Sequence, residues 1–272
     1  MAILIGMNDR LFPTNFRPIL EDIAFARANG FQAIQFHGKP DGLGESQLGA
    51  SLAATGAALR DAGIAPVMEI VLAVDAHGQH ESGRPPIAVL EANLPAITAL
   101  GCTCVHWHVV LRQRADAPVI DALEAALVSQ FAAGVALAAQ HGFRFGVEHN
   151  APEARPYHTA ARSTALLDAV PGLGFVWDLN HTPLDELDAY LALARRMTML
   201  HVADTALPET NQHVPLGLGN LDFRQIMGEL LRRGFSGPAI LEIGGLPKSG
   251  GYGRDTDEAL ISSRDLLLAA LV

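Results

Sequence analysis

The stretch "LDFRQIMGELLRRGFSGPAILEI" (221–243) contains a helix, a turn and a strand in succession. Apolar residues recur at helical spacing over 222–233, and Gly234 follows, which is typical of a helix C-terminus. "PAILEI" (238–243) is a short apolar run of the kind that forms a buried strand. This stretch therefore predicts one complete unit of a repeating α/β fold, with an acid, Glu242, near the end of its strand.

The same unit recurs along the whole chain. Strand-like runs are predicted at 3–7, 31–37, 64–72, 102–110, 143–149, 174–180, 197–204 and 238–243. Helices are predicted near 17–29, 47–62, 87–99, 119–140, 158–169, 184–196, 222–233 and 255–270. Glycine also follows the predicted helices at Gly30, Gly63 and Gly142. Eight such pairs with no Pro/Gly/Ser-rich linker predict a single (β/α)8 barrel domain over residues 1–272, with a doubly wound sheet as the alternative.

The composition restricts the class of protein. Hydrophobic residues make up 49% of the 272 residues and charged residues 18%, so the chain can bury a large core. The formal net charge of -10 disfavours a nucleic-acid partner. The N-terminus lacks signal-peptide features, and no apolar run approaches the roughly 20 residues that cross a bilayer. We therefore expect a soluble cytoplasmic protein with no membrane partner, in which Cys102 and Cys104 are reduced core residues.

Ionisable residues gather near the C-terminal ends of the predicted strands, where a barrel of this kind carries its functional groups. They are His37, Glu69, His106, His108, Glu148, Asp178, His181, His201, Asp204 and Glu242. His37 and Glu69 are equally well interpreted as solvated rim residues, and one of His106 and His108 as a core histidine, with His108 the better site candidate. Asp204 has the alternative of a turn or cap residue.

Four of these residues are hard to explain as isolated groups. Glu148, Asp178, His201 and Glu242 each belong to an apolar strand, and buried charges are costly without a common counter-charge. Asp178 has the alternative of capping the helix that follows it. A shared divalent cation would satisfy all four residues. Three carboxylates and one imidazole favour Mn²⁺, Mg²⁺ or Co²⁺, with Zn²⁺ possible.

These motifs together resemble the xylose isomerase-like TIM-barrel superfamily, which includes sugar isomerases and epimerases and shares its fold with abasic-site endonucleases. The resemblance is carried by "GFQAIQFHG" (30–38), "GVEHN" (146–150), "WDLNH" (177–181), "MLHVAD" (199–204) and "HVPLGLGNLDFRQIMGELLRRGFSGPAILEI" (213–243).

The resemblance implies roles for individual residues. Glu148, Asp178, His201 and Glu242 match the positions that hold one divalent metal ion in those enzymes, and Glu148 and Glu242 match the acid/base pair as well. His181 matches the histidine that bonds a substrate oxygen. His37, His108 and His213 are the further candidates for substrate binding.

The expected function is therefore that of a metal-dependent sugar isomerase or epimerase with a small carbohydrate substrate, and a homo-oligomer is possible. A lyase like the keto-inositol dehydratases of the same scaffold is the alternative, since the same site chemistry would eliminate water from a suitable substrate. A zinc endonuclease of the abasic-site type is a further alternative, although Asn211 stands where that group has an Asp ligand. A barrel that binds sugar without catalysis also stays open. Lys248 and Arg254 follow the last strand and leave a phosphorylated substrate possible.

Overall fold

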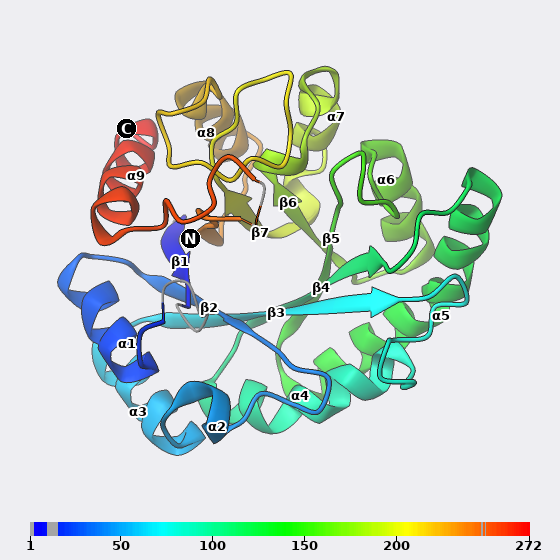
Figure 1. Ribbon diagram of the computed structural model, residues 1–272, viewed down its shortest axis with the longest axis horizontal. Coiled ribbons are helices and arrows are strands. Elements are labelled where there is room, and N and C mark those ends of the chain that lie inside the picture. The colour runs from blue at the N-terminus through cyan, green and yellow to red at the C-terminus, as the bar shows by residue number, and fades with distance from the viewer. Residues whose placement is uncertain (1–2, 10–15, 246, 248) are drawn as a thin grey trace.

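The computed structural model describes residues 3–9, 16–245, 247 and 249–272. Eight parallel strands form a closed barrel in chain order, in which the last strand pairs with the first (Figure 1). The strands are β1 (Leu4–Asn8), β2 (Ala33–His37), β3 (Ala65–Val74), β4 (Cys104–Leu111), β5 (Arg144–Glu148), β6 (Gly174–Asp178), β7 (Met197–Val202) and β8 (Pro238–Leu241). The predicted (β/α)8 barrel is confirmed, and the doubly wound alternative is wrong because a doubly wound sheet has open edges.

The helices surround the barrel (Figure 1). They are α1 (Ile19–Ala28), α2 (Glu45–Leu48), α3 (Leu52–Ala62), α4 (Pro86–Leu100), α5 (Ala117–His141), α6 (Ala160–Ala169), α7 (Leu187–Leu191), α8 (Phe223–Arg232) and α9 (Asp257–Ala270). Gly63 and Gly142 end α3 and α5 in the left-handed conformation, as the turn pattern predicts. The helix predicted over 184–196 is wrong in detail, because short 3₁₀ turns flank the five-residue α7 there.

One helix departs from the expectation about membrane-spanning length. Among the described residues, α5 is the helix that is long and apolar enough to cross a bilayer by length and composition. Its buried residues recur at helical spacing, including Ile120, Leu123, Leu127 and Phe131, and it packs on β5, α4 and α6. This packing is what an outer helix of a barrel requires, so the apolar length of α5 has an explanation within the fold.

The interior of the barrel has an apolar layer below a polar one. Ala33, Val67, Cys104, Val176, Met199 and Ile240 form a buried cluster inside the barrel. Since side chains alternate along a strand, the residue two positions further on faces the same way. On six strands that residue is polar, and the six are Gln35, Glu69, His106, Asp178, His201 and Glu242. The strand period thus places a polar layer at the C-terminal end of the barrel.

Candidate metal centre and active site

Three of the four predicted metal ligands belong to this polar layer, and Glu148, at the end of β5, lies with them. One ligand atom from each of Glu148, Asp178, His201 and Glu242 lies within 4.8 Å of the others. His201 Nδ1 is 3.1 Å from Glu148 Oε1 and 3.1 Å from Glu242 Oε2. Glu148, Asp178 and His201 are buried, and Glu242 is partly open. Strands β5, β6, β7 and β8 therefore bring four ligand atoms to one point.

The hydrogen bonds around His201 leave one ring nitrogen for a cation. His201 Nε2 donates to Gln35 Oε1 at 2.8 Å, and the Gln35 amide is oriented by donating from Nε2 to Asn8 Oδ1 at 3.0 Å and to Glu69 Oε2 at 3.3 Å. His201 Nδ1 consequently faces the two glutamates, and it is the ring nitrogen that would offer its lone pair to a bound cation. A metal-bound histidine usually donates its other N–H to such an oxygen, so this arrangement suits a metal ligand.

The unsatisfied atoms of the quartet provide a second test of whether a cation fits. Both carboxylate oxygens of Glu148, Asp178 Oδ2 and His201 Nδ1 are buried without a hydrogen-bond partner. Burial by itself lowers the pKa of His201, but Glu148 and Glu242 outweigh it and raise this pKa well above the ordinary value. Burial raises the pKa of Asp178. Such groups are expensive to bury unless they share a counter-charge, and the donor set fits a divalent cation.

Asp178 also has the capping role that the sequence leaves open. Its Oδ1 accepts a hydrogen bond from Asn180 N at 2.7 Å, at the start of the 3₁₀ turn Leu179–His181. Its Oδ2 is directed to the site and lies 3.1 Å from His181 Nε2. One oxygen of Asp178 therefore caps the turn while the other faces the site.

His149 holds His181 in place and was not singled out from the sequence. Its carbonyl oxygen accepts a hydrogen bond from His181 Nδ1 at 3.1 Å, and its own Nε2 donates to the Asp178 carbonyl at 3.0 Å. Burial lowers the pKa of His149 to about 3, so the ring is neutral. It stacks on the Tyr190 ring at a centroid distance of 4.3 Å. His149 thus ties the ends of β5 and β6 together beneath His181.

A second polar cluster lies over β1 to β5. His37 Nδ1 is 2.9 Å from Asp9 Oδ1, and His37 Nε2 is 3.2 Å from Glu69 Oε2. On the other side, His108 Nδ1 is 3.2 Å from Glu69 Oε1, and His108 Nε2 is 2.9 Å from Asn150 Oδ1. The solvated-rim interpretation of Glu69 is wrong, since Glu69 is only 4% exposed, and His37 is held between two carboxylates.

The charges in this cluster shift one another's pKa values. Burial opposes the charged forms of both histidines, but Asp9 and Glu69 raise the pKa of His37 to about 10. Glu148 and Glu69 likewise raise that of His108 to about 10. Burial opposes ionisation of Glu69 as well, yet its hydrogen bonds to the two histidines hold its pKa well below the ordinary value. The cluster therefore behaves as an alternating row of cations and anions.

The two histidines of β4 occupy different depths. His106 is buried, with Nε2 3.3 Å from Glu148 Oε2 and its ring 5.0 Å from the ring of His201. Burial lowers the pKa of His106, which favours the neutral ring. His108 lies one pleat nearer the mouth and is partly open. His108 is thus the histidine that a ligand can reach, and His106 packs beneath the carboxylates.

His213 lies at the site, but its ring is engaged within the protein. Nδ1 is 2.9 Å from the Glu242 carbonyl oxygen, and Nε2 is 2.9 Å from Asn211 Oδ1. Its backbone N–H donates to Asn180 Oδ1 at 2.9 Å, and Asn180 Nδ2 donates in turn to the Asp204 carbonyl at 2.7 Å. His213 therefore connects the loop after β7 with Glu242, and Asn180 connects that loop with Asp178.

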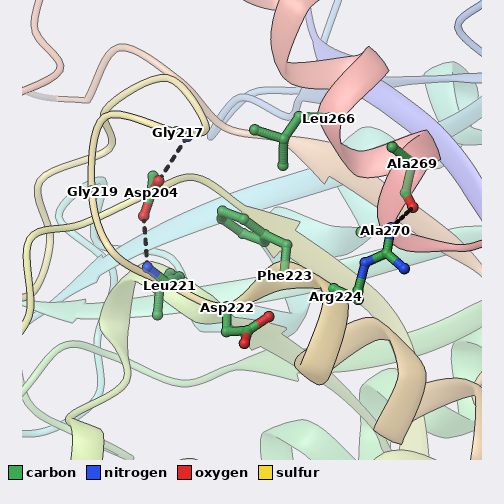
Figure 2. Close-up of a pocket in the computed structure, with 10 residues that line it drawn as sticks. All are labelled: Asp204, Gly217, Gly219, Leu221, Asp222, Phe223, Arg224, Leu266, Ala269 and Ala270. Atoms are coloured by element: carbon green, nitrogen blue, oxygen red, sulfur yellow. Dashed lines mark hydrogen bonds between the residues drawn. The ribbon is translucent and has the colours of Figure 1, made fainter.

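Asp204 organises the same loop rather than joining the metal quartet. Its carboxylate accepts hydrogen bonds from the backbone N–H groups of Thr205, Gly217 and Leu221, the last two of which are drawn in Figure 2. A pocket of about 410 Å³ is lined by residues of this loop and of α8 and α9. Figure 2 draws these lining residues. None of the four predicted metal ligands lines that pocket. The turn interpretation of Asp204 thus describes its contacts. Lys248 lies outside the described residues, and Arg254 is exposed.

Comparison with known proteins agrees with this architecture. A family model described as the xylose isomerase-like TIM barrel matches residues 23–264. No protein with a curated description matches the sequence significantly. Among solved structures, the D-allulose 3-epimerase from Methylomonas sp. has a TM-score of 0.74 at 17% identity, with 100% of both chains covered.

Two other solved structures extend the comparison. The 3-keto-D-glucoside 4-epimerase from E. coli has a TM-score of 0.73 at 16% identity, over 97% of this chain and 100% of that one. The IOLI protein with a bound zinc atom has a TM-score of 0.77 at 17% identity, over 99% and 98% of the two chains. At these identities the likeness establishes a shared fold. Because the family model covers most of the sequence, the chain belongs to the xylose isomerase-like TIM barrel family.

Proposed function

We propose that the protein is a divalent-metal-dependent sugar isomerase or epimerase. It would transfer a proton next to the carbonyl group of a small ketose, aldose or related polyol ketone. The observation that carries the proposal is the approach of Glu148 and Glu242, from different strands, to the same nitrogen of His201 at 3.1 Å. Two carboxylates that converge from β5 and β8 can serve as a base on one side of a substrate and an acid on the other.

The four clustered residues are proposed to hold the metal. Glu148, Asp178, His201 and Glu242 offer three carboxylates and one imidazole, a donor set that suits Mn²⁺, Mg²⁺ or Co²⁺ and also admits Zn²⁺. A bound divalent ion supplies Lewis acidity, which makes the C–H bond next to a carbonyl more acidic. The similar structure with a bound zinc atom supports a metal site on this fold.

Each side chain of the site is proposed to have a separate role in proton transfer or substrate binding. One of Glu148 and Glu242 removes the proton from the carbon next to the carbonyl, and the other returns a proton to the neighbouring position or the opposite face. His181, held by the His149 carbonyl, would bond a substrate oxygen. His37 and His108 are proposed to contact substrate hydroxyl groups. His213 would act by holding the carbonyl of Glu242.

The proposal is tested by exchange of the substrate α-proton in deuterium oxide. Candidate ketoses are incubated with the metal-loaded protein, and deuterium incorporation is followed by NMR. Glu148→Gln and Glu242→Gln should each keep the fold yet reduce exchange at least a hundredfold. Near-normal exchange in both variants would remove these residues from the acid/base role. Elemental analysis should find about one divalent ion per chain, lost in Asp178→Ala.

Two alternatives are separated by the same measurements. A lyase would consume the ketose and release water, so a dehydrated product would appear instead of an isomer. The endonuclease is favoured by the further groups that could hold ions, namely Asp178, His181 and His213, and His108, Glu148 and His181. The bonds of both His213 ring nitrogens within the protein count against it. Nearly three zinc ions per chain would support the endonuclease.

A further inference from the structure

The partly exposed side chains of the polar layer define one open sector. The exposed fractions of the side chains are 18% for His108, 17% for Glu242 and 14% for His37. Those of Glu148 and His201 are both 0%. Solvent therefore reaches side chains on β2 and β4 and the residue that follows β8. These three side chains flank the cluster that contains Glu69.

The polar groups in this sector alternate between hydrogen-bond donors and acceptors. Glu69 is an acceptor, and it lies between His37 Nε2 and His108 Nδ1 at 3.2 Å from each. The far nitrogen of each ring also faces an acceptor, Asp9 Oδ1 for His37 and Asn150 Oδ1 for His108. Both rings therefore present N–H groups to Glu69. The row reads donor, acceptor, donor.

The row is rigid, because each ring is anchored from behind. The Asn150 amide donates to the carbonyls of Val109 at 2.7 Å and Pro156 at 2.6 Å, so its oxygen is fixed toward His108. Asp9 is buried and holds His37 at 2.9 Å. Side chains fixed in this way lose little entropy when they bind a ligand.

Glu69 keeps the capacity to accept a further hydrogen bond. Its two oxygens receive three contacts, from His37, His108 and Gln35, at 3.2 to 3.3 Å. A carboxylate has about four acceptor positions, and these distances are at the long end of the hydrogen-bond range. One ligand atom each of His37, Glu69 and Glu242 lies within 4.8 Å of the others. A group bound at Glu69 would therefore lie beside Glu242.

We propose that Glu69 is a specificity-determining residue that, between His37 and His108, binds the hydroxyl groups of an uncharged polyol chain. The placement of the chain beside the reacting carbon at Glu242 rests on the proposed function, whereas the binding of the polyol does not. A hydroxyl group can donate to the acceptor position that Glu69 keeps open. Phosphate oxygens at neutral pH mainly accept, and the ring nitrogens of His37 and His108 are already directed to Asp9, Glu69 and Asn150. The open position of the subsite is therefore an acceptor, which suits the hydroxyl groups of a neutral polyol better than phosphate oxygens.

Binding of sorbitol, a polyol that has no carbonyl group, tests the subsite without catalysis. Isothermal titration calorimetry of the metal-loaded protein should show that Glu69→Gln weakens binding by about ten- to a hundredfold, because a charged acceptor is lost. Glu124→Gln is the matched control, since Glu124 is also ion-paired but to Arg162 on the outer helices. Its affinity should equal that of the wild type. Equal affinity in Glu69→Gln, or no sorbitol binding by the wild type, would overturn the proposal.

Proton exchange with a long and a short ketone separates recognition from a structural role. D-fructose carries the polyol chain, whereas dihydroxyacetone has the carbonyl and its neighbours alone. Glu69→Gln should lower the exchange efficiency for D-fructose by about tenfold or more and leave that for dihydroxyacetone unchanged. An equal loss for both compounds would assign Glu69 a structural role and overturn the proposal.

A replacement variant and the wild-type exchange result cover the remaining outcomes. If Glu69→Gln does not fold, His37→Leu replaces it and should weaken sorbitol binding by a similar factor, because it removes the N–H group that holds Glu69 in position. Unchanged sorbitol binding in that variant would overturn the proposal. No exchange of either ketone by the wild type would overturn the proposed function alone, since sorbitol binding tests the subsite independently.

Discussion

Gln35 gives a quantitative test of how the fold supports the metal centre. It is buried and makes three hydrogen bonds, accepting from His201 Nε2 and donating to Asn8 Oδ1 and Glu69 Oε2. Gln35→Leu removes all three with little change in volume. The buried N–H of His201 loses its acceptor, which costs about 1–3 kcal/mol, and Glu69 loses a donor to a charged group, which costs about 1.5–3 kcal/mol.

The apolar side chain offsets part of this cost. Burial of leucine contributes about 1.5–3 kcal/mol, so the net loss of unfolding free energy should be near 2 kcal/mol in the metal-free protein. Affinity for the proposed metal ion should also fall, because His201 loses the partner that orients its ring. Removal of such a partner typically lowers metal affinity by about ten- to a hundredfold.

Urea unfolding of the metal-free protein and metal competition with a chromogenic chelator measure the two effects separately. Gln130→Leu is the matched control, since Gln130 is half-buried and accepts one hydrogen bond, from Ile87 N at 3.2 Å. It should change stability by less than about 1 kcal/mol and leave metal affinity unchanged. Lower stability of Gln35→Leu with unchanged metal affinity would refute the view that Gln35 orients a metal ligand.

The remaining predictions concern pH, thiol reactivity and loop packing. The pKa of His37 is raised to about 10, so the contribution of His37 to stability is complete below pH 6.5 and is lost as the pH rises toward 10. The unfolding free energy measured in urea should fall over this pH range, and the fall should be smaller in His37→Gln. Burial raises the thiol pKa of Cys102 and Cys104, so neither should react with a thiol reagent at pH 8 until the chain unfolds, and prompt reaction would contradict their core placement. A Cβ at Gly219 would lie 2.2 Å from the Thr205 carbonyl oxygen, so Gly219→Ala should cost about 1–3 kcal/mol in unfolding free energy. At Gly228, in mid-helix with nothing within 4 Å, the same change should stabilise by about 0.5–1 kcal/mol, and equal effects at the two sites would refute the packing argument.

The eight βα units and the strand face of each ionisable group could be predicted from the sequence because both depend on local periods. A strand alternates its side chains, so an apolar residue at Met199 and an ionisable one at His201 share a face. The same step joins Ile240 to Glu242 and Val176 to Asp178. Once eight βα units close into a barrel, residues at strand ends must converge.

The partners of these residues could not be predicted in the same way. His149 and Asn180 hold Asp178 and His181 through hydrogen bonds that involve backbone atoms. Every residue has the same backbone atoms, so the residue type does not reveal such bonds. Gln35 and Asp9 carry no feature that distinguishes them from ordinary polar residues until their neighbours on other strands are known. The helix expected over 184–196 gave way to short turns, because tertiary packing outweighs a weak local preference.

The sequence by itself therefore determined the eight βα units, the strand that carries each ionisable group and the face on which it lies, because side-chain periodicity is a local property of the chain. Closure of the sheet into a barrel was decided by the tertiary structure. Only the tertiary structure decided that Glu69 is buried between His37 and His108, that His201 turns Nδ1 toward two carboxylates, and that His213 is engaged within the protein. Those facts depend on distances between strands far apart in the chain. Hydrogen bonds and charge interactions act through such distances, and closure of the barrel sets them.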